Sequence, residues 1–593
     1  MQQELLKSRA AEWEKWKKFG AATVLSPDEV QEYIDKGYKT LPMQWVEIDK
    51  NEPKRTAENP DIPALYKSRL VGRGDLEKKS NEDLRSDSPT CDVEGVNMVF
   101  SFAASNKLKL RSADITNAYF QGEKLTRILI FKQPPGGLPG VQEGECLLAR
   151  VPIYGTKDAG RGFWKKLRKT LTDAGMKENR IIKALYSYAV DGDIKLILAT
   201  HVDDILWACK PEAEHIVEKA KSAFEFGAEG SGTLRYCGKE VTQHEDFSIT
   251  VTCKDTTMKT EPVRIQPGRK LTENLNEGEK TQLLSVVGSL NWIARQCRPD
   301  ISYRVSRLRS RVNIGTIADL KEANKVLAYS IATADQGLTF KSGVLDWNNL
   351  VSAVVTDASH ANEVEELKDG RVEAHRSQGA RLQLLATPSI IDGTECNFHL
   401  IGHASTTIKR VCRATLQAEA YGLTSGVEEG DRLRAAIAEM KGKLPKILGN
   451  DWEAAAAAEI PQVWLTDCAS LEQSLNKRVM SKVADKRLSI EIAALRQPLW
   501  RAVGNAHGDP NYDDYKPEET TDKVRWIDTD VMLADPLTKG MDPDKLRVAL
   551  KENHWDLTAP VESVIKKRAK QLQRSKSTEA KQDPPPELKK LVE

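Results

Sequence analysis

Apolar residues fill most of the stretch from Ile194 to Trp207, and Asp203 and Asp204 stand side by side within it. An apolar run that stops at a polar pair and then resumes predicts two strands joined by a tight turn. Two adjacent carboxylates in a buried hairpin repel each other and lose hydration, at a cost of several kcal/mol. A divalent cation would offset that cost. A plain polar turn is the alternative, and the hairpin alone does not decide between the two.

A second predicted strand, from 108 to 114, ends at Asp114 and leads into a turn with two aromatic residues. A helix predicted from about 160 to 171 separates it from the hairpin. Strand, helix, strand, strand is the core of a split βαβ sheet, in which the first strand lies beside the hairpin. Asp114 would then join Asp203 and Asp204 on one sheet face. Three carboxylates there can hold two cations about 3.5–4 Å apart, as nucleotide addition to a 3′ hydroxyl requires.

The C-terminal half contains another set of acids at element ends. A predicted strand from 351 to 357 ends at Asp357, and Glu419 opens a long helical pattern. Asp467 follows a strand from 463 to 466, and Asp535 starts a helix after a strand from 524 to 527. Two further strands are predicted at 380–385 and 398–401. Four carboxylates placed in this way predict a two-metal site for phosphodiester hydrolysis.

Basic residues lie near the first group of acids. Lys67 and Arg69 alternate along a short strand predicted from 66 to 74, and such a strand can hold a polyanion such as a triphosphate. An ordinary solvated strand edge is the alternative. The helix from 160 to 171 has one apolar face and one basic face. The basic face is either solvated or a contact for a phosphate backbone.

The composition limits the class of protein. The chain has 593 residues, enough for three or four domains, with 40% apolar residues and a mean hydropathy of −0.49. These values are typical of a soluble globular protein, and no apolar run is long enough to span a bilayer, so no membrane partner is expected. The net charge of +2 implies no partner. Nine cysteines without a Cys-x-x-Cys pair fit neither a zinc module nor a disulfide framework, and indicate a reducing compartment.

With these segments in order, the chain resembles the reverse transcriptase and ribonuclease H region of copia-type LTR retrotransposon polyproteins. The similarity covers residues 35 to 545. Blocks in the family's order carry it: Lys67–Val71, Asp114–Phe120, Tyr154–Trp164, His201–Asp204, Leu234–Val241, Val287–Leu290 with Arg298–Tyr303, Leu416–Tyr421 and Leu533–Lys539.

The resemblance implies a multidomain α/β and α+β fold. A right-hand polymerase with fingers, a ferredoxin-like palm and a thumb would precede a ribonuclease H-like α/β domain. We expect a charged helical segment at 1–34, fingers and palm at 35–250, thumb and helical connection at 251–345, the ribonuclease H-like domain at 346–545 and a disordered basic tail at 546–593. Polyproteins of this type also carry a protease, a zinc-knuckle nucleocapsid and an integrase. Their counterparts are missing, so we expect a processed C-terminal part or a reading frame from a decayed copy.

The resemblance also implies residue roles. Asp114 and Asp203 would be the principal polymerase metal ligands, with Asp204 completing the triad. Tyr119 would exclude a ribose 2′ hydroxyl. The other substrate-binding residues would be Lys67 and Arg69, which grip the triphosphate, with Lys157 and Arg161. The ribonuclease H acids would be Asp357, Glu419, Asp467 and Asp535. Each active site would use two Mg²⁺ or Mn²⁺ ions.

The implied function is RNA-directed DNA polymerase with ribonuclease H activity. Its partners would be an RNA template, a DNA primer, the RNA–DNA hybrid, deoxynucleoside triphosphates and the protease, integrase and capsid of the same element. The cytoplasm, within a virus-like particle, is the expected location, with the nucleus as a second one. The alternative is a decayed relic that only binds nucleic acid. His201 and Asp158, which depart from the family pattern, favour the relic, whereas the presence of all seven acids favours an enzyme.

Overall fold

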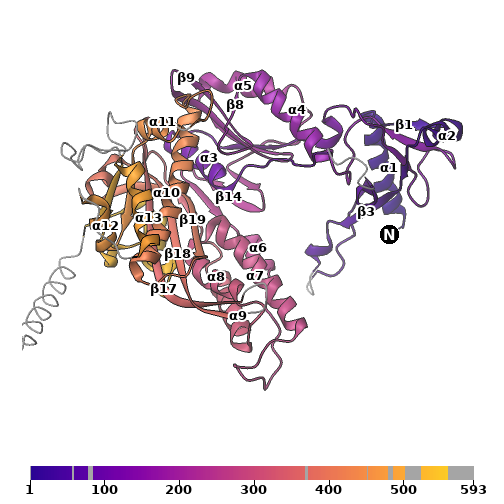
Figure 1. Ribbon diagram of the computed structural model, residues 1–593. Coiled ribbons are helices and arrows are strands. Elements are labelled where there is room, and N and C mark those ends of the chain that lie inside the picture. The colour runs from indigo at the N-terminus through magenta and orange to yellow at the C-terminus, as the bar shows by residue number, and fades with distance from the viewer. Residues whose placement is uncertain are drawn as a thin grey trace, which may run out of the picture. The chain divides into compact units, whose positions relative to one another are not determined.

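The computed structural model describes residues 2–55, 59–77, 84–366, 372–449, 452–477, 485–500 and 522–558. The chain divides into two units, one of residues 1–99 and 109–231 and the other of residues 100–108 and 232–593. Figure 1 shows the elements of the first unit in indigo to magenta and most of the second in rose to yellow. Among the described helices, none combines the length and the apolar character needed to cross a bilayer.

The first unit contains a six-stranded sheet whose strand order is β12-β5-β11-β10-β9-β8. The predicted hairpin is confirmed, since β10 pairs antiparallel with β11 and β11 pairs with β5, which sets Asp204 directly opposite Asp114. Two helices cover one face of the sheet, with Phe163, Leu167 and Leu171 in the shared core. The elements are β5 (Arg111–Asp114), α4 (Ala159–Ala174), β8 (Lys177–Glu178), β9 (Leu185–Val190), β10 (Asp193–His201), β11 (Asp204–Cys209), α5 (Glu214–Lys221) and β12 (Gly230–Ser231).

The N-terminal residues belong to this same unit. Trp13 and Trp16, on one face of the first helix, are buried with Leu70, Phe120 and Phe131. Helix α1 therefore contributes to this unit's core, so residues 2–34 are not a segment apart from 35–250. The elements are α1 (Gln2–Lys18), β1 (Ala22–Leu25), α2 (Pro27–Asp35), β2 (Thr40–Leu41), β3 (Met43–Asp49), β4 (Tyr66–Gly72), β6 (Ile130–Lys132), β7 (Cys146–Ala149) and the first part of α3 (Val93–Ser105), whose residues from Phe100 onward belong to the second unit.

The second unit begins with a four-stranded sheet and four helices. Its strand order, β13-β14-β15-β16, joins residues near 250 to residues near 340. The expected domain boundary between 250 and 251 therefore falls inside one sheet, and the connection predicted as helical to 345 ends in a strand. The elements are β13 (Thr233–Tyr236), β14 (Lys239–Gln243), β15 (Ile249–Thr252), α6 (Lys254–Lys259), α7 (Glu277–Cys297), α8 (Ser302–Ser310), α9 (Ile317–Ala332) and β16 (Leu338–Phe340).

A mixed six-stranded sheet, in the order β21-β20-β17-β18-β19-β22, forms the rest of the second unit. The helix α10 packs closely on it because Gly426 and Gly430 face Val354, where an added Cβ would lie 2.6 and 2.5 Å from the valine methyl carbons. The elements are β17 (Val351–Glu366), β18 (Val372–Ala386), β19 (Cys396–Thr407), α10 (Thr415–Met440), α11 (Trp452–Glu459), β20 (Gln462–Thr466), α12 (Ala469–Asn476), α13 (Lys486–Leu499), β21 (Lys523–Trp526), α14 (Asp544–Glu552) and β22 (His554–Trp555).

The start of the predicted tail is ordered. Residues 546–558 include most of α14 and all of β22, and Leu546, Leu550 and Trp555 are buried. Burial of these side chains stabilises the segment against the sheet, so the predicted boundary at 545 is wrong. The remainder of the predicted tail, 559–593, lies outside the described residues.

Candidate active sites

A strained turn positions the first group of acids. Val202, between β10 and Asp203, has φ +58°, a left-handed conformation that costs a β-branched residue about 1–2 kcal/mol. The carbonyl of Asp203 accepts a hydrogen bond from the backbone N–H of Ile115 at 2.9 Å. This bond fixes the turn to the residue that follows Asp114. The two acids therefore lie at the same end of the sheet.

A cavity of about 210 Å³ lies at this end of the sheet. Asp114 and Asp203 line it, together with Lys67 and Arg69 from β4. The Arg69 guanidinium lies over the ring of Tyr154, 5.0 Å from its centroid. The structure thus brings four of the predicted residues together, with acids and bases around one space. Their roles stay predictions.

Burial and mutual repulsion disfavour the charged forms of the acids in the first group. Burial, followed by the charge of Asp203, raises the pKa of Asp114. Burial and the charges of Asp203 and Asp114 raise the pKa of Asp204 to about 6, although Asp204 does not line the cavity. Burial also lowers the pKa of Lys67. Carboxylate oxygens are the ligands that Mg²⁺ and Mn²⁺ prefer, so a divalent cation fits between Asp114 and Asp203.

The other predicted substrate-binding residues differ in their positions. The ring of Tyr119 packs on Tyr154, with centroids 4.7 Å apart, next to the cavity. The Lys157 Nζ donates to the carbonyl of Glu77 at 2.7 Å, and Arg161 donates to the Asp87 carboxylate at 2.5 Å. Neither Lys157 nor Arg161 lines the cavity. Their charges are used within the protein, so the prediction that they bind substrate gains no support from their positions.

Asp158 is paired within the protein and does not line the cavity. Its two carboxylate oxygens accept hydrogen bonds from Arg127 at 2.8 and 2.7 Å. Arg127 also pairs with Glu77, so one guanidinium compensates both carboxylates in part. The sequence pattern did not identify this partner, which lies 31 residues earlier in the chain.

Glu12 and Lys15 also line the cavity, and the sequence pattern did not identify them. Glu12 is 3% exposed, and its carboxylate lies 3.1 Å from the Lys15 ammonium. One signal was available, because Trp13 and Trp16 define an inward face of α1 and residues beside that face lie at its edge.

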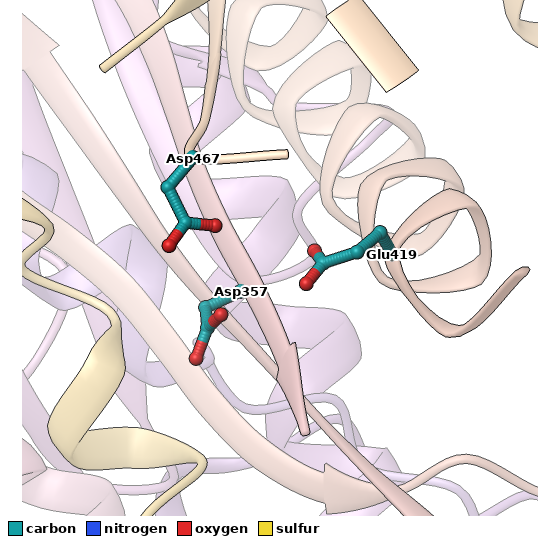
Figure 2. A group of neighbouring side chains, drawn as sticks. All are labelled: Asp357, Glu419 and Asp467. Carbon is teal, nitrogen blue, oxygen red and sulfur yellow. The ribbon is translucent and has the colours of Figure 1, made fainter. Parts of the chain in front are cut away.

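The second group of acids converges in the other unit (Figure 2). Asp357 lies on β17, Glu419 in the first turns of α10 and Asp467 directly after β20, and one oxygen from each lies within 4.8 Å of the others. The parallel pairing of Val355 with Leu465 places Asp357 and Asp467 at equivalent positions two residues further on. The sheet register is therefore the cause of the convergence.

The carboxylates of the second group are buried with little compensating positive charge, which favours binding of a cation. Asp357 and Glu419 are 1% and 4% exposed, and Glu419 Oε2 is buried without a hydrogen-bond partner. Burial and the charges of Asp357 and Asp467 raise the pKa of Glu419 well above its usual range, and burial raises the pKa of Asp467. A buried carboxylate oxygen without a donor is costly unless a cation binds it. The three residues therefore fit a divalent cation such as Mg²⁺ or Mn²⁺.

Asp535 is linked to this group by Lys539, which forms ion pairs with both Asp535 and Asp357. The Lys539 Nζ lies 2.6 Å from Asp535 Oδ1 and 3.4 Å from Asp357 Oδ2. The hydroxyl of Thr538 also donates to Asp357 Oδ2. Burial and the charge of Asp357 raise the pKa of Asp535 to about 6. Asp535 is thus adjacent to Asp357 but outside the group of three.

The block from Arg298 to Tyr303 has a structural role. Arg298 is 3% exposed. It forms a bidentate ion pair with Asp300, at 2.9 and 2.8 Å, and also donates a hydrogen bond to the carbonyl of Thr333. The hydroxyl of Tyr303 donates to Glu363 at the end of β17, at 2.8 Å. These bonds fasten α8 and α9 to one another and to the sheet that carries Asp357.

Comparison with known proteins finds relatives of the region that contains the first site. Residues 30–257 match the family described as reverse transcriptase (RNA-dependent DNA polymerase). The chain is 25% identical over 316 residues to the retrovirus-related Pol polyprotein from transposon RE2 of Arabidopsis thaliana, and 26% identical over 318 residues to that from transposon RE1. The predicted relationship to copia-type LTR retrotransposon polyproteins is thereby confirmed.

The extent of these matches is limited. Each covers 51% of this chain and 21% of the relative, so the chain spans about a fifth of the length of the curated relatives it matches. Among solved structures, the foamy viral protease–reverse transcriptase in complex with double-stranded DNA has a TM-score of 0.44 and 11% identity. That likeness covers 85% of this chain and 70% of the other, and at this level it supports no conclusion.

Proposed function

We propose that the first unit synthesises DNA on an RNA template. The observation that carries the proposal is the cavity in which Asp114 and Asp203 lie with Lys67 and Arg69. Two acids and two strong cations suit a magnesium-bound triphosphate, because the acids hold the metal and the cations hold the phosphate oxygens. The reverse transcriptase family match over residues 30–257 supports the same reaction.

Each residue of this site then has a role. Asp114 and Asp203 hold the cations, and Asp204, directly opposite Asp114, keeps the local charge negative. Lys67 and Arg69 bind the triphosphate of an incoming deoxynucleotide, and Tyr119 lies on Tyr154 where it can meet the sugar. Two bound Mg²⁺ or Mn²⁺ ions would activate the primer 3′ hydroxyl and stabilise the pyrophosphate. In this proposal the sheet of β5, β10 and β11 is a palm, the preceding elements are fingers, and α6 to α9 form a thumb and connection.

We propose that the second group of acids belongs to a ribonuclease H-like domain. Asp357, Glu419 and Asp467 come from two parallel strands and a helix that packs on the same sheet. Such a buried acidic group suits metal-assisted cleavage of a phosphodiester. The substrate is the RNA strand of an RNA–DNA hybrid, which the protein reads through phosphates and 2′ hydroxyls. Within a retroelement, the products would pass to the integrase, inside a cytoplasmic particle and then in the nucleus.

Two assays on the full chain test this proposal. The first measures extension of a DNA primer on an RNA homopolymer, and the second cleavage of a labelled RNA strand in a hybrid, each with Mg²⁺ and then Mn²⁺. We expect both activities, and Glu419→Gln should lose hybrid cleavage. Glu428→Gln, an exposed acid on the same helix, is the matched control and should retain it. A folded chain without either activity in either ion would support the relic that only binds nucleic acid.

A further inference from the structure

We propose that Lys539 occupies the second cation position of the nuclease-like site and that a divalent ion must displace it. The first cation position is the space among Asp357, Glu419 and Asp467. The second cation position is the space between Asp357 and Asp535. This inference rests on the proposed ribonuclease H function and adds a competitor to its metal site.

The Lys539 ammonium lies where a second ion would share Asp357. Its Nζ is 2.6 Å from Asp535 Oδ1 and 3.4 Å from Asp357 Oδ2. The side chains of Asp535 and Asp357 are 8% and 2% exposed, so the ammonium is their nearest compensation in a buried setting. A pair of ions that share a carboxylate would occupy the two sides of Asp357. One of those sides already holds a cation from the chain itself.

The two cation positions are compensated unequally. Glu419 Oε2, at the first position, is buried and has no hydrogen-bond partner. Asp357 Oδ2, at the second position, accepts from the Thr538 hydroxyl and contacts the Lys539 ammonium. The first position therefore lacks a positive charge, whereas the second has one. We expect a first ion to bind tightly and a second ion to bind more weakly.

Displacement of Lys539 is feasible. The side chain is 40% exposed, so the ammonium can move into water while its methylene stem stays in place. A divalent ion carries twice the charge of the ammonium and gains more from the same two carboxylates. The net binding free energy of the divalent ion is smaller than this, because the ion pairs of Lys539 with Asp535 and Asp357 must first be broken. Removal of the lysine charge should therefore strengthen binding of the second ion by about tenfold, the lower end of the effect of a nearby charge.

The test is a titration with Mn²⁺, the free ion being measured by electron paramagnetic resonance. The full chain carries Asp114→Asn and Asp203→Asn so that the acids of the first unit do not bind. In this background Lys539→Met, and Lys539→Gln as a second neutral variant, should tighten the second binding step about tenfold. Lys539→Arg keeps the charge and should leave that step weak. Lys325→Met, at an exposed lysine of α9, is the matched control and should change nothing.

Two results would overturn the inference. One is a second step of equal affinity in the parent and in both neutral variants. The other is equal tightening by Lys539→Arg, which would show that side-chain shape and not charge is responsible. Glu419→Gln in the same background should remove the tight first step, which assigns the ions to this site.

A second measurement separates this inference from the proposed function. It is the cleavage of RNA–DNA hybrids by the chain with Asp114 and Asp203 intact. If it cuts hybrids and the second ion is unaffected by Lys539→Met, only the inference about Lys539 fails. If it does not cut hybrids, the nuclease proposal fails, while the ion titration still reports on Lys539. If both hold, the Mg²⁺ concentration at half-maximal cleavage should fall about tenfold in Lys539→Met.

Discussion

The two acidic sites differ in where their positive charges lie. In the first unit Lys67 and Arg69 belong to another strand than the acids and line a cavity of about 210 Å³ with them. In the second unit Lys539 lies between two of the acids themselves. A cavity with its own cations suits a small, highly charged ligand that enters it. In the second site, a metal ion can replace the lysine ammonium among the buried acids. An ion bound there can contact a single phosphodiester of a larger nucleic acid.

The difference also concerns how the acids are held. Asp203 lies in a strained two-residue turn, whereas Asp357 and Asp467 extend from paired parallel strands and Glu419 from a long helix. A turn can adjust when a ligand arrives, while a sheet and a packed helix resist change. We therefore expect the first site to be sensitive to the residues around the cavity and the second to be sensitive chiefly to its own acids and Lys539.

Among the residues around the acids of the first site, Tyr119→Val should have the largest effect. Because the Tyr119 ring packs on Tyr154, which lines the cavity, its removal opens space where a ribose 2′ hydroxyl could fit. We expect discrimination against ribonucleotides to fall by about tenfold or more, a typical gain from such space. Incorporation of matched ribo- and deoxynucleotides measures it. Tyr38→Val, at an exposed tyrosine, is the control, and unchanged discrimination in Tyr119→Val would make Tyr119 a core residue only.

A smaller effect is expected from Lys15→Ala in α1. Lys15 lines the cavity and would add a third cation for the triphosphate, but its side chain is 39% exposed, which weakens its charge. A loss of about 1 kcal/mol corresponds to a roughly fivefold higher KM for deoxynucleotides, with kcat little changed. Lys7→Ala, an exposed lysine of the same helix, should leave KM as it is. An equal rise in both variants would indicate general loss of positive charge and not a cavity residue.

The smallest effect concerns pH. The pKa values of Asp204 and Asp535 are raised to about 6 in the folded chain, above the value of about 3.9 in an unfolded one. The folded state therefore binds more protons than the unfolded state between these values. The stability of the ion-free protein should thus fall as pH rises from about 4 to about 6.

Calorimetry at pH 5 and pH 7 measures this effect. Asp204 is half-buried, and Asp535 is buried beside the Lys539 ammonium. Screening by solvent and by that ammonium limits each contribution to about 1 kcal/mol, or about 2–4 °C in Tm. Mg²⁺ should raise Tm more at pH 7 than at pH 5, because carboxylates bind metal only after losing their protons. Stability that rises with pH in the ion-free protein would contradict the raised pKa values.

Local patterns predicted the parts of each site that depend on neighbouring residues. The hairpin at Asp203, the strand that ends at Asp114 and the strand before Asp467 follow from runs of apolar residues and are present. Contacts between distant segments were not predictable in this way. The Arg127 partner of Asp158 depends on packing that no local period encodes. For Lys15, the helical period places the side chain at the edge of the buried face of α1 but does not show that the cavity lies there.

Some elements also lacked a local signal. The strand β16 has only three residues and exists because β15, far earlier in the sequence, pairs with it. The strand β17 extends to Glu366, well past its apolar part, because it pairs along its length with β18. Polar residues in such a ribbon look like a loop in the sequence. Cross-strand hydrogen bonding decides the outcome there, and hydrophobic periodicity does not report it.

The central claim is that the chain carries two separate metal-dependent sites, and one paired measurement tests it. Primer extension and hybrid cleavage are measured on the same preparations of the parent, Asp203→Asn and Asp467→Asn. An amide replaces a metal-binding carboxylate poorly, which is worth several kcal/mol, so each variant should lose at least about a thousandfold of one activity. Asp203→Asn should lose extension and retain cleavage, and Asp467→Asn the reverse. Loss of both activities in either folded variant, or of neither, would contradict the account.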